Sequence, residues 1–185
     1  LLSSTIIYEI LKNKALDVVL KDGRELIETQ DQNHKSTVNW KATQTKIDFF
    51  FKTNSAKTTL VPGFVAQDSD GNSSTLGRGG SDFSAAILAY ALDADVLEIW
   101  TDVSGMYTAN PKLVRQATPI EKLSYLEAME LSHFGAKVIY PPTLQPLVEK
   151  QIPVLIKNTF APADKGTRID HTEKEINNTV VKGIS

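Results

Sequence analysis

The sequence predicts an α/β fold in which strands alternate with helices. Short runs rich in β-branched and apolar residues at 15–22, 58–67, 95–102 and 152–160 are typical of strands. Segments with apolar residues at helical spacing lie between them, among them TVNWKATQTKIDFFFKT and DFSAAILAYAL. Alternation of this kind is the pattern of a layered α/β sheet, in which ligands gather at the carboxyl ends of the strands.

Composition supports a globular protein and excludes several classes of function. Of 185 residues, 41% are hydrophobic and 23% are charged, the balance of a folded domain. The net charge of -2 favours neither nucleic acid nor an anionic membrane. There is no cysteine, which excludes disulfides and thiolate chemistry and agrees with a cytoplasmic protein. No apolar run approaches the roughly 20 residues that span a bilayer.

The first segment, LLSSTIIYEILKN, is predicted to form an amphipathic helix. Its apolar residues fall on one broad face: Leu2, Ile6, Ile7, Ile10 and Leu11. The segment has neither an initial Met nor the basic leader of a secretory signal. The last residues, NNTVVKGIS, resemble the opening of a strand. We therefore expect the chain to be part of a longer protein.

The first half of the chain then alternates between elements. A strand is predicted at 15–22, and polar residues follow it from 23 to 36, with TQDQNHKS as the best loop candidate. Trp40, Ile47, Phe50 and Phe51 have helical spacing. A strand at 58–67 is expected to end in the tight turn DSDGN.

The second half continues the pattern. DFSAAILAYAL is predicted to be a buried helix, and 95–102 is a continuous apolar run typical of a strand covered on both faces. SYLEAMELSHFGAKV and PPTLQPLVEKQ are predicted helices, followed by an apolar strand at 152–160. Two loops qualify for ligand binding, one after Gln67 and one after Trp100.

The segment STLGRGGSD, at the start of the buried helix, has the chemistry of an anion site. Its glycines Gly77, Gly79 and Gly80 allow positive φ and a close approach of the backbone to a ligand. Backbone amides and the helix N-terminus form an anion cradle, and Arg78 can form a fork on a carboxylate or phosphate. Ser81 and Asp82 fit helix-capping positions. A glycine-rich turn before a capped helix, with Arg78 in solvent, explains the same residues without a ligand.

The segment IWTDVSGMYTANPK follows the apolar strand at 95–102. Thr101 and Asp102 are expected at the end of the strand, and Gly105 permits a sharp turn. Tyr107 could stack on an aromatic base, and Lys112 could reach a phosphate. Asn110-Pro111 closes the loop. On composition alone, a strand exit with an Asx-turn fits equally well.

In ELSHFGAKVIYPPTLQPL, one helix is predicted to end at Gly135 and another to begin soon after. Lys137 is placed to meet an anion at that second N-terminus, or to be a surface lysine. The scattered histidines His34, His133 and His171 give no metal constellation.

Four of these motifs together carry a resemblance to a known family. TLGRGGSDFSAAILA, EIWTDVSGMYTANPK, ELSHFGAKVIYPPTLQPL and IPVLIKNTF, in this order, resemble aspartokinase, a member of the amino-acid kinase superfamily. The similarity extends over most of the chain. YPPTLQP and IKNTF are more similar to the bifunctional aspartokinase/homoserine dehydrogenase than to the single-function enzyme.

The resemblance implies an incomplete three-layer αβα sandwich that transfers the γ-phosphoryl group of ATP, with Mg²⁺, to the side-chain carboxylate of L-aspartate. The product would be 4-phospho-L-aspartate, the first intermediate toward lysine, threonine and methionine. Residues 1–170 would form a partial kinase domain, and 171–185 a linker with the first strand of a regulatory domain. The full-length protein would be a homo-oligomer.

The resemblance also implies a role for each candidate residue. Arg78 would hold the α-carboxylate of aspartate, with Gly79, Gly80 and Ser81 around it, and Asp82 would organise the catalytic groups. The remaining residues would bind ATP: Thr101, Asp102 and Tyr107 at the adenine and ribose, Lys112 and Lys137 along the phosphates. Lys112 stands where many relatives have arginine, and Asn110 where many have aspartate.

Two expected motifs are absent. Aspartokinases begin with Lys-Phe-Gly-Gly-Thr-Ser, and a Gly-Glu pair precedes the stretch that LLSST matches; neither occurs here. G-x-G-x-x-G, the dinucleotide fingerprint, is also missing. We therefore expect the chain by itself to have little or no kinase activity.

Two alternatives to an aspartate kinase stay open at this point. One is a sibling kinase that acts on glutamate or a nucleoside monophosphate, although GRGGSD suits an amino-acid zwitterion better. The other is a nucleotide-binding or assembly module without catalytic activity. A substrate panel separates the first alternative, and calorimetry with ADP and aspartate separates the second.

Overall fold

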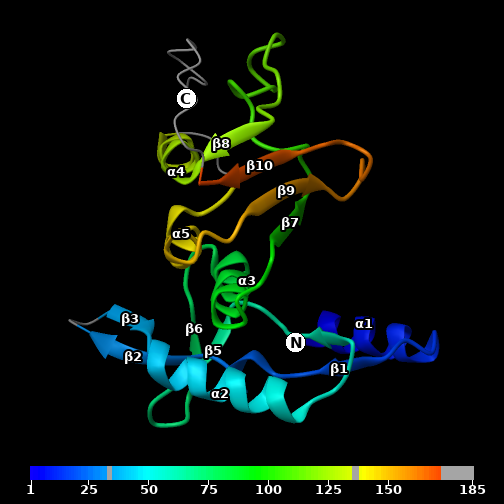
Figure 1. Cartoon of the computed structure of the whole chain (residues 1–185), viewed down its shortest axis with the longest axis vertical. Coiled ribbons are helices and arrows are strands. Elements are labelled where there is room, and N and C mark those ends of the chain that lie inside the picture. The colour runs from blue at the N-terminus through cyan, green and yellow to red at the C-terminus, as the bar shows by residue number, and fades with distance from the viewer. Residues whose placement is uncertain (33–34, 135–137, 172–185) are drawn as a thin grey trace. The chain divides into compact units, whose positions relative to one another are not determined.

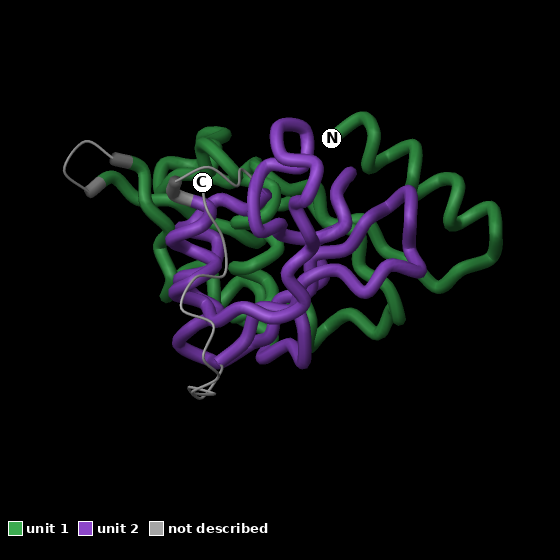
Figure 2. Tube along the Cα trace, turned by 90° about the horizontal axis from the view of Figure 1, so that it is seen from above, with its two compact units in different colours: residues 1–92 green, residues 93–185 purple. Residues whose placement is uncertain are grey.

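A computed structural model describes residues 1–32, 35–134 and 138–171 (Figure 1). The chain divides into two compact units, residues 1–92 and residues 93–185, which Figure 2 shows in green and purple. Each unit has its own β-sheet structure and its own buried hydrophobic residues. Among the residues that the structure describes, no helix has the length and apolar character needed to cross a bilayer.

Helices and short strands alternate along unit 1. Its elements are α1 (Leu2–Asn13), β1 (Val18–Leu20), the 3₁₀ helix η1 (Gly23–Glu25), β2 (Glu28–Gln32), β3 (Lys35–Val38), α2 (Trp40–Thr53), β4 (Thr58–Leu60), β5 (Val65–Asp68), β6 (Ser73–Thr75) and α3 (Gly80–Ala91). β1 and β4 form a parallel pair. The other sheet has the order β3-β2-β5-β6, with β2 and β5 parallel and the outer pairs antiparallel.

The core of unit 1 fixes α3, the helix that the glycine-rich segment enters. Ile47 of α2 and Ile87 of α3 are fully buried in one cluster with Leu26, Ile27 and Ala66. The ring of Trp40 also meets that of Tyr90 edge-on, with 5.2 Å between centroids. Because two helices and a strand share this core, the N-terminal end of α3 has a defined place beside β5 and β6.

Unit 2 is built around one mixed sheet with the order β7-β9-β10-β8. Its elements are β7 (Leu97–Thr101), β8 (Lys122–Ser124), α4 (Tyr125–Phe134), the 3₁₀ helix η2 (Pro141–Thr143), α5 (Gln145–Glu149), β9 (Val154–Asn158) and β10 (Thr167–Asp170). β7 is parallel to β9, and β10 is antiparallel to β9 and parallel to β8. Its fully buried side chains include Leu123, Val154, Ile156 and Ile169. Helices and mixed sheets in both units confirm the predicted α/β class.

The prediction of a loop at TQDQNHKS was wrong. Its described residues belong to β2 and β3, which pair antiparallel with Thr29 opposite Val38. Thr29 is 2% exposed, and its hydroxyl donates to Ser74 Oγ over 3.0 Å. These polar residues form strands because their backbone groups pair with neighbouring strands and the buried Thr29 hydroxyl has a hydrogen-bond partner. Local β-propensity does not contain this information.

The single strand predicted at 58–67 is also wrong, because the chain breaks it into β4 and β5. Pro62 lacks an N–H for a strand ladder, and Phe64 adopts a left-handed φ of +75°. The turn DSDGN that follows β5 is confirmed, with Gly71 at φ +87°. β6 then intervenes, so the glycine-rich segment lies one strand later than the loop predicted directly after Gln67.

Other predicted elements differ in detail. β7 is not covered on both faces: exposed Glu98 and Trp100 alternate with buried Leu97 and Ile99, as in a strand with one face in solvent. PPTLQPLVEKQ forms η2 and the short α5 rather than one helix. α1 confirms the predicted N-terminal helix, and none of its residues is buried.

Candidate active site

The glycine-rich segment leaves β6 and enters α3 through a tight turn. Gly77 and Gly79 have φ of +71° and +66°, values that glycine adopts without steric cost. The amide of Gly80 donates to the carbonyl of Gly77 over 3.0 Å and closes the turn. α3 begins at Gly80, with Gly79 as its N-cap. Gly77 and Gly79 therefore permit the backbone turn that brings the amides of the first turn of α3 to the surface of the loop.

Phe64 supports this turn from the strand break before β5. Its amide donates to Ser84 Oγ (2.9 Å), the Ser84 hydroxyl donates to the Gly80 carbonyl (2.8 Å), and the Leu76 amide donates to the Phe64 carbonyl (3.0 Å). A Cβ atom at Gly80 would lie 2.8 Å from the Phe64 ring. Both ends of the loop are thus tied to one residue with left-handed backbone geometry.

The predicted capping by Ser81 and Asp82 was wrong. Gly79 is the N-cap without a side-chain cap, and both residues lie in the first turn of α3. Within the described residues, neither of their amides has a hydrogen-bond acceptor. Helix-forming backbone after a glycine N-cap leaves these donors open. Open donors and the helix dipole together favour an anion at this end of α3.

Two charged side chains flank the open amides. Arg78 is exposed, and no carboxylate of the described residues forms an ion pair with it. Asp82 is half-buried, and burial raises the pKa of its carboxyl above the ordinary value. Unit 1 therefore offers a cation for an anionic ligand, next to a carboxylate that protein surroundings have partly removed from water.

In unit 2, the predicted residues begin at the end of β7, as expected. Thr101 is the last residue of β7 and lies opposite Asn158 of β9. Its hydroxyl donates to Asp102 Oδ1 over 3.2 Å, and its carbonyl accepts from the Thr159 amide over 2.8 Å. Asp102 is exposed. Its carboxylate is therefore open to a ligand at the carboxyl end of the strand.

The loop after β7 carries the other described candidates of unit 2. Tyr107 is partly buried, whereas Lys112 is exposed. The Lys112 amide donates to Asn110 Oδ1 over 3.0 Å, which forms an Asx-turn within the loop. The Ser104 hydroxyl contacts both Asn158 and Asp164, which joins the loop to the segment after β9. Lys137 lies outside the described residues.

The structure thus brings the candidates together in two groups. Residues 78–82 share one turn of backbone in unit 1. Thr101, Asp102, Tyr107 and Lys112 lie at the end of β7 and on its following loop in unit 2. No cluster of three or more His, Asp or Glu side chains that could hold a metal ion occurs at positions 1–32, 35–134 and 138–171.

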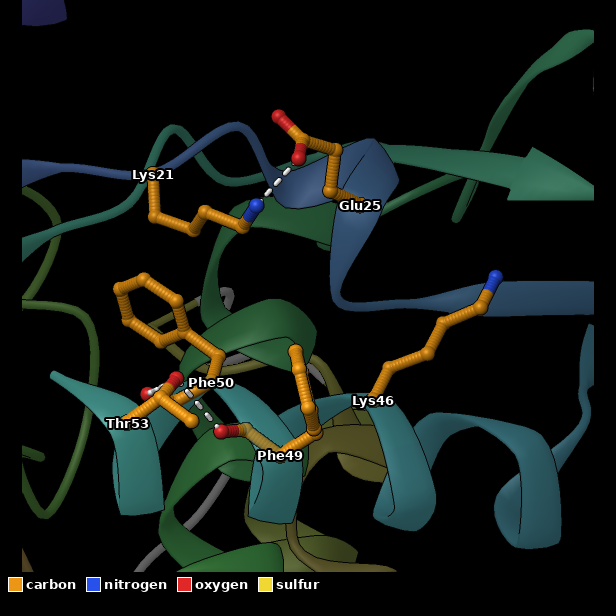
Figure 3. Close-up of a pocket in the computed structure, with 6 residues that line it drawn as sticks. All are labelled: Lys21, Glu25, Lys46, Phe49, Phe50 and Thr53. Atoms are coloured by element: carbon orange, nitrogen blue, oxygen red, sulfur yellow. Dashed lines mark hydrogen bonds and ion pairs between the residues drawn. The ribbon is translucent and has the colours of Figure 1, made fainter.

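A pocket of about 270 Å³ lies elsewhere in unit 1, between η1 and α2 (Figure 3). It is lined by Lys21, Glu25, Lys46, Phe49, Phe50 and Thr53. Lys21 pairs with Glu25, and Lys46 Nζ lies 2.8 Å from Glu28 Oε2. Because carboxylates already neutralise both ammonium groups, this pocket is less suited to an anion than the turn at Arg78.

Comparison with protein families decides the wider relationship. Residues 2–158 match the amino acid kinase family. The chain belongs to this family. The match extends into both units and includes every candidate residue of the two groups, so the turn at Arg78 and the loop after β7 are parts of one amino acid kinase chain.

The amino acid kinase chain is similar to aspartokinases. It is 52% identical over 129 residues to the bifunctional aspartokinase/homoserine dehydrogenase of Haemophilus influenzae, which is 70% of this chain and 16% of that protein. It is 41% identical over 170 residues to the same enzyme of Buchnera aphidicola, 91% of this chain and 21% of that protein. The E. coli aspartokinase III structure in complex with aspartate and ADP has a TM-score of 0.85 at 34% identity, covering 94% of this chain and 39% of that one. These findings confirm the resemblance inferred from the motifs, and they show that the chain spans well under half of each relative.

Sequence reasoning missed two residues of this amino acid kinase chain that shape the candidate site. Phe64 was read as part of a strand, and its left-handed backbone has no sequence signal of its own beyond the preceding Pro62-Gly63. Thr167 was not singled out at all, although it is fully buried and bonds to the loop after β7. Both act through partners far away in the sequence.

Proposed function

We propose that this chain is part of an aspartate kinase, which phosphorylates the side-chain carboxylate of L-aspartate with ATP to give 4-phospho-L-aspartate. The observation that carries the proposal is the turn at 77–82, where an exposed Arg78 without a carboxylate partner among the described residues adjoins the open amides of Ser81 and Asp82. An amino acid supplies the carboxylate that such a turn recognises. The solved E. coli relative that contains aspartate and ADP supports this choice of ligands.

In the proposed assignment, the two groups divide the substrates. Arg78, Gly79, Gly80, Ser81 and Asp82 bind aspartate, and Arg78 forms a bidentate pair with its α-carboxylate. The nucleotide is bound by Thr101, Asp102, Tyr107, Lys112 and Lys137. Arginine gives the fork geometry that a planar carboxylate needs, whereas the two lysines act as point charges along phosphates.

The proposed reaction needs positioning more than covalent help. A side-chain carboxylate oxygen of aspartate attacks the γ-phosphorus of ATP, the bond to the β–γ bridging oxygen breaks, and ADP leaves. Cations near the transferring oxygens stabilise the charge that develops. Mg²⁺ would supply part of that charge. The ion would be held mainly by phosphate oxygens, because the described residues offer no group of three or more carboxylates or histidines that could hold it.

The proposal extends to the role of the whole protein. 4-Phospho-L-aspartate opens the synthesis of lysine, threonine and methionine, in the cytoplasm. Residues 1–170 would be part of the kinase domain, and 171–185 would lead toward a regulatory domain. The identity with two bifunctional relatives supports a parent that also carries homoserine dehydrogenase. We propose that the chain alone has little or no activity, because it spans 16 to 39% of the relatives compared.

Substitution of Arg78 tests the carboxylate clamp in the full-length protein. Arg78→Ala is expected to raise the KM for aspartate about 10- to 100-fold, because a hydrogen-bonded charge contact is lost. Arg78→Lys should recover part of this loss without the fork geometry. The measurement is initial rate against aspartate concentration in a coupled ADP-release assay.

The KM for ATP is the internal control, and it should stay within about twofold of the unmodified value. A panel with glutamate and uridine monophosphate checks the substrate. An unchanged KM for aspartate in Arg78→Ala, or a preference for another acceptor, would contradict the proposed function.

A further inference from the structure

The loop between β7 and β8 has a closed base. The Ile120 amide donates to the Met106 carbonyl over 2.8 Å, and the Thr108 amide donates to the Thr118 carbonyl over 2.9 Å. Tyr107 and Pro119 form an antiparallel bridge between these two bonds. Met106 is fully buried. The outgoing and returning segments of the loop therefore run side by side, and Tyr107 is held at the point where they pair.

Thr167, the first residue of β10, bonds to both segments at this base. Its side chain is fully buried. Its Oγ1 accepts a hydrogen bond from the Met106 amide over 2.8 Å and donates to the Ile120 carbonyl over 2.6 Å. A threonine hydroxyl has one proton to donate and lone pairs to accept. Both capacities are used on the two residues that close the loop.

The backbone around Thr167 is shaped for this contact. Gly105, which precedes Met106, has φ +113°. A Cβ atom there would lie 2.4 Å from Thr167 Oγ1 and 2.9 Å from the Thr167 amide nitrogen. Only a residue without a side chain lets the loop approach β10 this closely. The β10 strand itself is fixed by its pairing with β9 and β8.

We propose that Thr167 is a positioning residue for the nucleotide, acting through the loop that it clamps. Its hydroxyl sets the Met106–Ile120 base and thereby the place of Tyr107, the residue next to Met106. The inference rests on the proposed function, in which Tyr107 and its neighbours contact ATP. It adds a residue from a distant strand that touches no ligand and decides how well the loop fits the nucleotide.

Three substitutions at Thr167 in the full-length protein test the inference. Thr167→Val keeps the shape and removes the hydroxyl, so the KM for ATP and the Kd for ADP by calorimetry are expected to rise about tenfold, while the KM for aspartate stays within twofold. Thr167→Ser keeps the hydroxyl and should restore both nucleotide constants to within about twofold. Thr167→Cys, whose thiol bonds weakly, should give an intermediate value.

Tyr125→Phe is the matched control in the same unit. The Tyr125 side chain is 5% exposed, and its hydroxyl donates to the Ile152 carbonyl over 2.7 Å, away from the loop. Its loss should lower the thermal midpoint as Thr167→Val does and leave the nucleotide constants unchanged. This comparison separates a general loss of stability from a misplaced loop.

The outcomes are distinct. If Thr167→Val lowers the thermal midpoint but leaves the KM for ATP and the Kd for ADP unchanged, Thr167 has only a structural role and the inference is overturned. Should Thr167→Val fail to fold, nucleotide constants of Thr167→Cys equal to those of the unmodified protein overturn it as well. If the unmodified protein binds ADP but does not phosphorylate aspartate, the proposed substrate fails, and the ADP titrations still decide the role of Thr167.

Discussion

Gly166→Ala is expected to destabilise unit 2 by about 3 kcal/mol, the sum of backbone strain and overpacking. Gly166 has φ +73°, and a Cβ atom there would lie 2.0 Å from the carbonyl oxygen of Ile156 and 3.1 Å from its carbonyl carbon. Both atoms belong to the backbone of β9, so no side-chain rotation relieves the clash. β9 lies between β7 and β10, and its displacement would disturb the pairing on both sides.

Tryptophan fluorescence during urea unfolding measures this effect unit by unit. The chain has two tryptophans, Trp40 in unit 1 and Trp100 in unit 2. A Trp40→Phe background therefore reports on unit 2 alone. Gly71→Ala is the control, read from Trp40 in a Trp100→Phe background. Gly71 has φ +87°, but its Cβ would have only Gln67 Nε2 nearby, at 3.8 Å. About 1 kcal/mol is expected there, and equal losses in the two variants would refute the steric argument.

Asp82→Asn is expected to reduce kcat for aspartate phosphorylation about 10²- to 10³-fold in the full-length protein. Asp82 lies in the first turn of α3, which carries the open amides of residues 81 and 82. In the proposed site, its charge organises the groups around the transferring phosphoryl, and loss of one preorganised electrostatic group has an effect of this size. The coupled ADP-release assay gives kcat directly. A kcat within fivefold of the unmodified value would remove Asp82 from the catalytic groups.

The same substitution is expected to make the folded state more stable at pH 7. Burial raises the pKa of Asp82 in the folded protein, so protonation stabilises the fold. That contribution is fully present below the unfolded-state pKa and is lost as pH rises through the higher folded-state pKa. At neutral pH the folded protein therefore bears the desolvation cost of a charged carboxylate, which neutral asparagine avoids.

Urea unfolding at pH 7 and at pH 3.5 tests the sign of this effect. The gain from Asp82→Asn should be present at pH 7 and largely absent at pH 3.5. Asp102→Asn is the control, because Asp102 is exposed and its replacement should change stability little at either pH. A loss of stability at pH 7 in Asp82→Asn would show that the ionised carboxylate makes compensating contacts.

Much of the fold was predictable where the sequence itself carries a regular pattern. Helical spacing predicted α2 and α3, and apolar runs predicted β7 and β9. The short strands β6, β8 and β10 carry no such pattern and depend on pairing with strands remote in the sequence: Ile169 of β10 lies opposite Val154 of β9 and Leu123 of β8. The polar strands β2 and β3 also form because they pair with neighbouring strands, so their sequence alone did not predict them. Pairing between distant residues is not encoded in local propensity.

The residues of the candidate site were likewise predictable only where they carry a local sequence signal. Glycines and an arginine are local signals, so the turn at Arg78 could be found from the sequence, although the N-cap is Gly79 rather than the serine or aspartate predicted. The positions of Thr101 and Asp102 followed from the end of an apolar strand. Phe64 and Thr167 could not be found, because each matters through bonds to residues remote in the chain. The role of Lys137 stays a prediction.

The exposed apolar side of α1 determines how strongly this chain associates in solution. Leu2, Ile6 and Ile10 are 77%, 53% and 49% exposed and recur every four residues, so an exposed hydrophobic stripe runs along the helix. Such a stripe promotes aggregation, which increases with protein concentration. Light scattering of the purified protein should therefore rise steeply with its concentration, and the substitutions Ile6→Glu and Ile10→Glu should suppress this rise without altering Arg78 or its neighbours.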